Sequence, residues 1–242
     1  MRALALLLAG LALLGAAGCG DERPGRPIVF AAASLTEALP ALGGARFSFA
    51  GSGALAEQIR RGAPADVFAS ASPRETGELY REGLVERPVA LAYNRLAVIV
   101  PRANPAGIAS VADLARPGVR LSVAGPDVPV GAYAVEALAA LGLRRALGNV
   151  VSREPDVKDV VGKVALGEAD AGIVYATDAR AAETRLSTVP VPSRAQPRVR
   201  LEIAVVRGGH DRPGARRFVA RATGPEGRAA LAAAGFLPAA PS

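Results

Sequence analysis

Short apolar segments of strand length alternate along the chain with segments whose apolar residues recur every three or four positions. The first kind is typical of strands and the second of helices with one buried face, so their alternation predicts an α/β fold with mostly parallel sheets. The expected strands are residues 28–32, 46–49, 67–69, 96–100, 120–124, 172–175 and 201–206. The expected helices are residues 35–42, 55–61, 73–82, 111–114, 132–141, 157–166, 179–183, 214–223 and 225–233.

The N-terminal stretch does not follow this alternation and has the pattern of an export signal. A positive charge at Arg2 precedes an apolar run over residues 3–14, and small residues follow up to Cys19. The apolar run is too short for a membrane-spanning helix. Residues 1–18 are therefore expected to be a secretory signal peptide.

Cys19 is the only cysteine, which excludes a disulfide within the chain. Gly18-Cys19 after small residues resembles a bacterial lipobox, in which the signal is cut before the cysteine and the thiol is lipidated. The alternative is an incidental cysteine beside a plain cleavage site, and Ala16 stands where the lipobox usually has leucine. With a lipid on Cys19, residues 19–27 would be a polar tether to the membrane. The expected location is periplasmic or at the cell surface.

Charge and composition change this interpretation little. The formal net charge is +7 and the isoelectric point is about 10.4, which raises the question of a nucleic-acid partner. However, the arginines are scattered, aromatic residues make up only 4% of the chain, and the export signal directs it away from nucleic acid. No nucleic-acid partner is expected. With 242 residues, half of them hydrophobic, the chain can form one large domain or two smaller ones.

Two serines lie where expected strands lead into helices, and ligands bind at this edge of an α/β sheet. Ser34 precedes the first expected helix, where free backbone N–H groups and the positive end of the helix dipole favour an anion. Ser34 and Glu37 also match the S-x-x-E capping box, which needs no ligand. Ser52 lies between Gly51 and Gly53, which expose backbone N–H groups and remove side chains that would block a ligand.

Three further donors are expected from later junctions. In the loop before the helix at 132–141, the donor is the backbone N–H of Val130 or Gly131. Asp156 is a natural N-cap, which leaves the N–H of Val157 free to point outward. Tyr175 ends an expected strand, and its hydroxyl is either a further donor or an ordinary buried hydroxyl with a partner in the core. Such neutral donors can hold a desolvated oxyanion without any lysine or arginine.

Several segments together resemble the periplasmic molybdate-binding proteins of the ModA family, and the similarity covers nearly the whole chain after the signal. The matching segments are residues 31–36, 53–59, 62–68 and 128–131 with Tyr133, and residues 167–178. The resemblance implies a type II periplasmic-binding-protein fold with a two-strand hinge, in which residues 28–92 and 204–242 form one lobe and residues 93–203 the other. It implies capture of molybdate or tungstate for the permease of an ABC importer. It assigns the anion contacts to Ser34, Ser52, Val130, Val157 and Tyr175, through the oxygens and without direct coordination of the metal.

Three other functions are alternatives to molybdate or tungstate binding. Another tetrahedral oxyanion, such as sulfate or phosphate, would suit the same donors. A serine hydrolase using Ser34 or Ser52 would need a base, but the single histidine, His210, lies in a polar turn, and residues 51–53 do not form a nucleophile elbow. A lipoprotein that acts only by interaction would need no intact set of donors. A monomeric binding protein with no catalytic activity and no cofactor is therefore expected.

Overall fold

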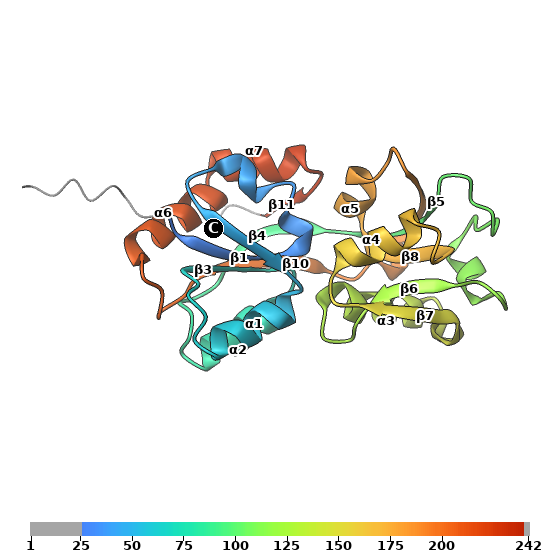
Figure 1. Ribbon diagram of the computed structural model, residues 1–242, viewed down its shortest axis with the longest axis horizontal. Helices are drawn as coiled ribbons and strands as arrows, with labels where there is room; N and C mark the ends of the chain where they lie inside the picture. The colour runs from blue at the N-terminus through green and yellow to red at the C-terminus, as the bar shows by residue number, and fades with distance from the viewer. Residues whose placement is uncertain (1–25, 240–242) are drawn as a thin grey trace, which may run out of the picture.

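The computed structural model describes residues 26–239, which form two lobes lying side by side (Figure 1). Each lobe is one β-sheet with helices on both faces. In the first lobe, α1 and α2 cover one face and α6 and α7 the other; in the second, α4 and α5 lie opposite α3. The helices are α1 (Ser52–Arg60), α2 (Pro73–Arg81), α3 (Pro129–Ala140), α4 (Val157–Ala165), α5 (Ala176–Ala181), α6 (Arg212–Thr223) and α7 (Pro225–Ala233).

Both sheets are mixed. In spatial order the first holds β11 (Leu237–Pro238), β4 (Val89–Asn94), β10 (Val199–Val205), β3 (Val67–Ser70), β1 (Ile28–Ala32) and β2 (Arg46–Ala50). The second holds β7 (Val150–Glu154), β6 (Leu121–Ala124), β8 (Ala171–Tyr175), β5 (Leu96–Pro101) and β9 (Leu186–Pro190). The predicted α/β class is confirmed, but the sheets are not mostly parallel. Parallel pairing joins β2, β1 and β3 in one lobe and β7, β6 and β8 in the other, while β4, β5, β9, β10 and β11 pair antiparallel.

Two crossings connect the lobes, at the places where a two-strand hinge was expected. The chain passes from β4 to β5 with only Arg95 between them, and it returns between β9 and β10. β10 pairs with β3 and β4 of the first sheet from Val199 onward. The lobe boundaries expected between residues 92 and 93 and between residues 203 and 204 therefore fall inside β4 and β10, because a strand belongs to the sheet with which it forms its hydrogen bonds.

The helix expected at residues 35–42 does not form. In its place are two short 3-10 turns, η1 (Ala33–Leu35) and η2 (Leu39–Leu42). Pro40 explains the difference, because it has no N–H to donate to the carbonyl four residues earlier. Three more 3-10 turns are η3 (Val111–Ala115), which replaces the helix expected at 111–114, η4 (Arg144–Asn149) and η5 (Ser193–Ala195).

Strands β4, β7, β9 and the two-residue β11 were not predicted. β7 and β9 are the edges of the second sheet, where one side of a strand has no sheet neighbour to bury it. Their alternation of apolar and polar positions is correspondingly weak, as in Val150–Glu154. β4 is rich in alanine, which has a low strand propensity.

Helices α1 and α2 pack on the first sheet through a compact apolar cluster. Phe30 and Phe68 from the strands pack with Leu55 and Ile59 of α1 and Leu79 of α2, and all five are at most 6% exposed. Burying each such side chain contributes about 1.5–3 kcal/mol. The cluster therefore fixes where α1 begins and with it the position of Ser52.

The predicted signal peptide, Cys19 and most of the predicted tether lie outside the described residues. Among the helices between residues 26 and 239, none has the length and apolar character needed to cross a membrane.

Candidate ligand-binding site between the lobes

The register of the parallel strands brings the expected donors to the facing edges of the two lobes. In the first sheet Ala32 is paired with Ala50, so the segments that follow β1 and β2 start side by side. In the second sheet β6 pairs in parallel with both β7 and β8, which places the ends of all three strands at one edge. These ends lead into α3, α4 and α5 respectively.

One small cavity between the lobes is lined by all five expected donors. The donors lining it are Ser34 and Ser52 from the first lobe and Val130, Val157 and Tyr175 from the second. Each of these five residues is at most 3% exposed. The two lobes are thus closed over the cavity.

Ser34 lies in η1, directly after β1. Its hydroxyl oxygen is buried and has no hydrogen-bond partner in the protein. The alternative in which Ser34 forms a capping box is therefore wrong: Ala32 occupies the N-cap position, and no side chain caps the turn. A buried hydroxyl without a partner costs about 1–3 kcal/mol, so a group that accepts its hydrogen bond would stabilise this site.

Ser52 is the first residue of α1, which begins three residues earlier than expected. Its hydroxyl oxygen accepts a hydrogen bond from the backbone N–H of Ala71, with a distance of 3.1 Å. This bond uses a lone pair and leaves the hydroxyl proton available. Because the first backbone N–H groups of a helix have no partner within it, the start of α1 offers further donors.

The structure distinguishes between the two candidate N–H donors, Val130 and Gly131, that were expected before α3. The N–H of Gly131 donates to the carbonyl oxygen of Val128 at 2.9 Å. Val130 follows Pro129 in the first turn of α3, where backbone N–H groups have no helical acceptor. Val130, and not Gly131, is thus the donor that lines the cavity.

Asp156 caps α4 in a way that leaves Val157 unused. Its carboxylate accepts the N–H groups of Lys158 at 2.7 Å and Asp159 at 3.1 Å. Val157, the first residue of the helix, is left as a cavity-lining N–H donor. Asp156 therefore has the N-cap role expected from the sequence, and its carboxylate does not use the N–H of Val157.

Tyr175 is the last residue of β8, and its hydroxyl is buried without a hydrogen-bond partner. The alternative of an ordinary core tyrosine with a satisfied hydroxyl is therefore wrong. Burial raises the pKa of this hydroxyl well above its ordinary value, with smaller contributions from Tyr133 and Asp178. The hydroxyl stays protonated and can act as a donor.

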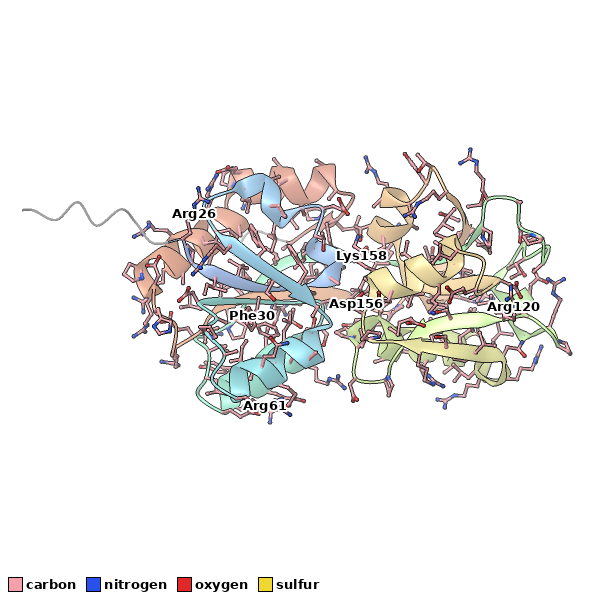
Figure 2. The ribbon with its side chains drawn as sticks, in the orientation of Figure 1. Arg26, Phe30, Arg61, Arg120, Asp156 and Lys158 are labelled. Atoms are coloured by element: carbon pink, nitrogen blue, oxygen red, sulfur yellow. The ribbon has the colours of Figure 1, made fainter. Side chains whose placement is uncertain are left out.

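A charged pair beside the cavity was missed by the sequence reasoning. The ammonium group of Lys158 lies 3.1 Å from a carboxylate oxygen of Asp178, whose side chain is fully buried. The same ammonium group lies 3.4 Å from the carboxylate of Glu37 in the first lobe, so it bridges the lobes. Figure 2 shows Lys158 and Asp156 on the side of the second lobe that faces the first. The available signal was that Lys158 is one of two lysines and directly follows Val157.

The Asp178 carboxyl predicts a specific pH dependence of stability. Burial raises its pKa from 3.8 to about 6, although Lys158 acts in the opposite direction. Between about pH 4 and pH 6 the folded protein thus holds a proton on Asp178 that the unfolded chain has lost. The contribution of Asp178 to the free energy of unfolding should fall as pH rises through this window. Urea denaturation of the wild type and of Asp178→Asn at several pH values measures it. A slope unchanged by the substitution would contradict the prediction.

The single histidine lies away from the cavity. His210 is exposed in the turn between β10 and α6 and does not line the cavity. The cavity-lining serines therefore have no histidine beside them to act as a base. Within residues 26–239, no three His, Cys, Asp or Glu side chains are grouped so as to hold a metal ion.

Two lobes joined by two crossing strands and closed over a small buried cavity define the class of extracytoplasmic solute-binding proteins. The family model for bacterial extracellular solute-binding proteins matches residues 29–237. The chain is 37% identical to the molybdate-binding protein ModA of Mycobacterium tuberculosis over 95% of each chain. It belongs to this solute-binding family, within the ModA group, as the sequence motifs indicated.

Solved structures agree on the fold. The periplasmic molybdate-binding protein of Azotobacter vinelandii matches with a TM-score of 0.77, covering 90% of this chain and 100% of that one at 23% identity. The sulfate-binding protein SubI of Mycobacterium tuberculosis matches with a TM-score of 0.76, covering 89% of this chain and 88% of that one at 19% identity. At these identities the likeness concerns the fold alone, and proteins named for different anions share it.

Proposed function

We propose that this protein captures molybdate or tungstate outside the cytoplasm and delivers it to the permease of an ABC importer. The relative from Mycobacterium tuberculosis, which is named as molybdate-binding, spans 95% of this chain. The physical observation that carries the proposal is the pair of buried hydroxyls without partners, Ser34 and Tyr175. They come from opposite lobes and line one cavity.

In this proposal the anion is held by neutral donors alone. The first lobe supplies the hydroxyl groups of Ser34 and Ser52 together with N–H groups at the start of α1. The second lobe supplies the N–H groups of Val130 and Val157 and the hydroxyl of Tyr175. Closing the lobes removes water from the anion, and in a dry site each charge-assisted hydrogen bond is stronger than in water. The closed, liganded form is the one that a permease would recognise.

Neutral donors also distinguish anions by their protonation state. A fully deprotonated tetrahedral dianion accepts hydrogen bonds at every oxygen, whereas a protonated anion presents its own O–H to one of the donors. The cavity therefore disfavours hydrogen phosphate. Sulfate is fully deprotonated like molybdate, and it is the second candidate because a sulfate-binding protein shares the fold.

A lipid on Cys19 would hold the protein at the membrane, with the segment before Ile28 as a tether. The protein would act as a single copy, with no cofactor and no catalytic step. The molybdenum or tungsten atom would be cargo, reached only through its oxygens.

Thermal denaturation of the exported protein tests the assignment of the ligand. Sodium molybdate or tungstate at 100 times its dissociation constant stabilises the native state by about 2.7 kcal/mol. For a chain of this size that corresponds to a rise in melting temperature of roughly 5–10 °C. Sulfate and phosphate are tested in parallel. A rise with sulfate, and none with molybdate or tungstate, would show that the ligand is wrong although the class of protein stands.

A further inference from the structure

The two glycines that flank Ser52 lie against the backbone of the opposite lobe. A Cβ atom placed on Gly51 would be 2.4 Å from the carbonyl oxygen of Pro155, and one placed on Gly53 would be 2.6 Å from that of Asp127. Real Cβ atoms essentially never approach other atoms closer than 3.0 Å. Both carbonyl groups belong to the second lobe, so it is the closed arrangement of the lobes that leaves no room for a side chain.

The backbone conformation does not require glycine at either position. Gly51 has φ −60° and ψ 138°, which any residue adopts. Gly53 lies in the first turn of α1, and neither glycine has a positive φ. Alanine in a helix is favoured over glycine by about 0.8–1 kcal/mol. The contact between the lobes is thus the feature that demands glycine.

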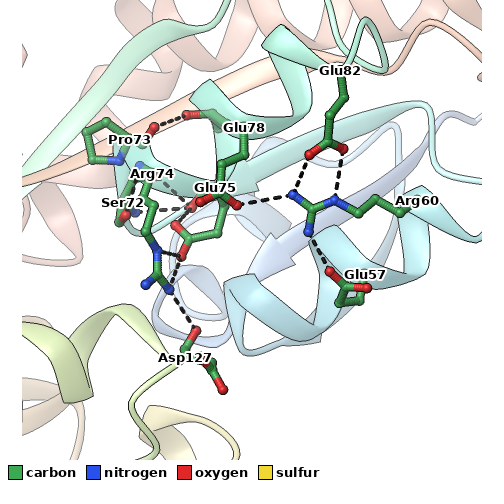
Figure 3. Close-up of polar contacts among 11 residues, drawn as sticks. Glu57, Arg60, Ser72, Pro73, Arg74, Glu75, Glu78, Glu82 and Asp127 are labelled. Carbon is green, nitrogen blue, oxygen red and sulfur yellow. Dashed lines mark hydrogen bonds and ion pairs between the residues drawn. The ribbon is translucent and has the colours of Figure 1, made fainter.

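The opposing carbonyl groups are held in place. Pro126 and Pro129 stiffen the loop that contains Asp127, and the other carbonyl belongs to a proline. The guanidinium group of Arg74, in the first lobe, donates to the Asp127 carbonyl oxygen at 3.3 Å (Figure 3). Arg74 is itself held by Glu75 at 2.8 Å. A methyl group at position 53 would therefore clash with the Asp127 carbonyl group, which cannot easily move away.

We propose that Gly51 and Gly53 are positioning residues that set how closely the two lobes approach, and that they thereby determine the affinity for the anion. This inference rests on the proposed function. A side chain at either position would hold the lobes apart beside Ser52. The N–H groups of Val130 and Val157 would then lie too far from an anion bound to the first lobe.

Gly131 provides a matched comparison. Its Cβ would lie 2.2 Å from the carbonyl oxygen of Gly125 and 2.4 Å from that of Ala124, both in its own lobe. Opening the lobes cannot relieve that clash, so Gly131→Ala should destabilise the fold itself. Gly77, within α2, has no atom within 4 Å of its Cβ position, which makes Gly77→Ala a neutral control.

The experiment compares these four alanine variants with the wild type. Calorimetric titration with sodium molybdate measures affinity, thermal denaturation without anion measures stability, and small-angle X-ray scattering measures closure. Gly51→Ala and Gly53→Ala should bind molybdate about 10- to 100-fold more weakly, the range expected of an overpacked contact. They should keep the wild-type melting temperature without anion and stay more open at saturating molybdate. Gly131→Ala should lose stability, and Gly77→Ala should match the wild type.

Two results would overturn the inference. One is wild-type affinity in Gly51→Ala and Gly53→Ala, and the other is weaker binding accompanied by the same loss of melting temperature as in Gly131→Ala. If the wild type binds sulfate and not molybdate, the assignment of the ligand fails, and the comparison is made with sodium sulfate. A wild type that binds no tetrahedral anion overturns both proposals.

Discussion

Replacing Ser34 with alanine, or Tyr175 with phenylalanine, is expected to weaken molybdate binding by about 1.5–3 kcal/mol, because each change removes a donor to a buried charge. Neither change should lower the stability of the unliganded protein, since both hydroxyls are buried without a partner. Removing an unsatisfied buried group is neutral or stabilising. Calorimetric titration and urea denaturation measure the two effects separately.

Ser52→Ala is the contrast for this prediction. It should weaken binding similarly, but it also removes the acceptor of the Ala71 N–H at 3.1 Å and leaves that buried donor unpaired. A loss of stability of about 1–3 kcal/mol is therefore expected without anion. Unchanged affinity in Ser34→Ala and Tyr175→Phe would show that neither hydroxyl contacts the ligand, and the proposed site would be wrong.

Replacing Lys158 with methionine is expected to lower the free energy of unfolding at neutral pH by about 3 kcal/mol, the lower end of the range for breaking a buried ion pair. The lower end applies because the Lys158 side chain is 30% exposed, whereas that of Asp178 is fully buried. The loss arises because the buried Asp178 carboxyl would lose its counter-charge, which leaves it either charged without a partner or forced to take up a proton. Urea denaturation at pH 7 measures it.

Asp178→Asn introduced together with Lys158→Met should recover most of this loss, since the uncompensated charge is then absent. Glu37→Gln is the control at the other contact of Lys158. That contact is 3.4 Å long and involves an exposed carboxylate, so its removal should change stability by less than about 0.5 kcal/mol. An equal loss in Lys158→Met with and without Asp178→Asn would show that the pair does not explain the effect.

The neutral donors and the Lys158–Asp178 ion pair occupy different positions. The cavity is lined by serine, tyrosine, small and apolar residues and by Asp156. The Asp156 carboxylate accepts N–H groups of α4, while Lys158 and Asp178 form a pair beside the cavity. Lys158 therefore neutralises a buried carboxylate near the site, and the anion is left to the neutral donors. With this arrangement, the selectivity of the site for an anion depends on the number and direction of its hydrogen bonds.

Much of the fold and of the candidate site could be predicted from local patterns. Strand β1 was expected with its observed bounds, and α4 and α7 to within one residue. All five expected donors lie where a strand leads into a helical turn, and they line one cavity. The prediction failed where one local signal was outweighed by another. Pro40 broke a helix that the apolar spacing favoured, and edge strands such as β7 lacked the alternation of buried ones.

The sequence by itself determined which groups are offered at each strand end, because the backbone and side-chain types of a junction are local properties. Only the tertiary structure decided which of those groups are unoccupied. The N–H of Gly131 is used by Val128, while the hydroxyl of Ser34 is used by none of its neighbours. Likewise, Gly51 and Gly53 were expected to clear space for a ligand. Gly51 does line the cavity, but the structure shows that both glycines also clear space for the other lobe. The physical reason is that the partner of a hydrogen bond or of a close contact comes from segments far away in the chain, which no local pattern specifies.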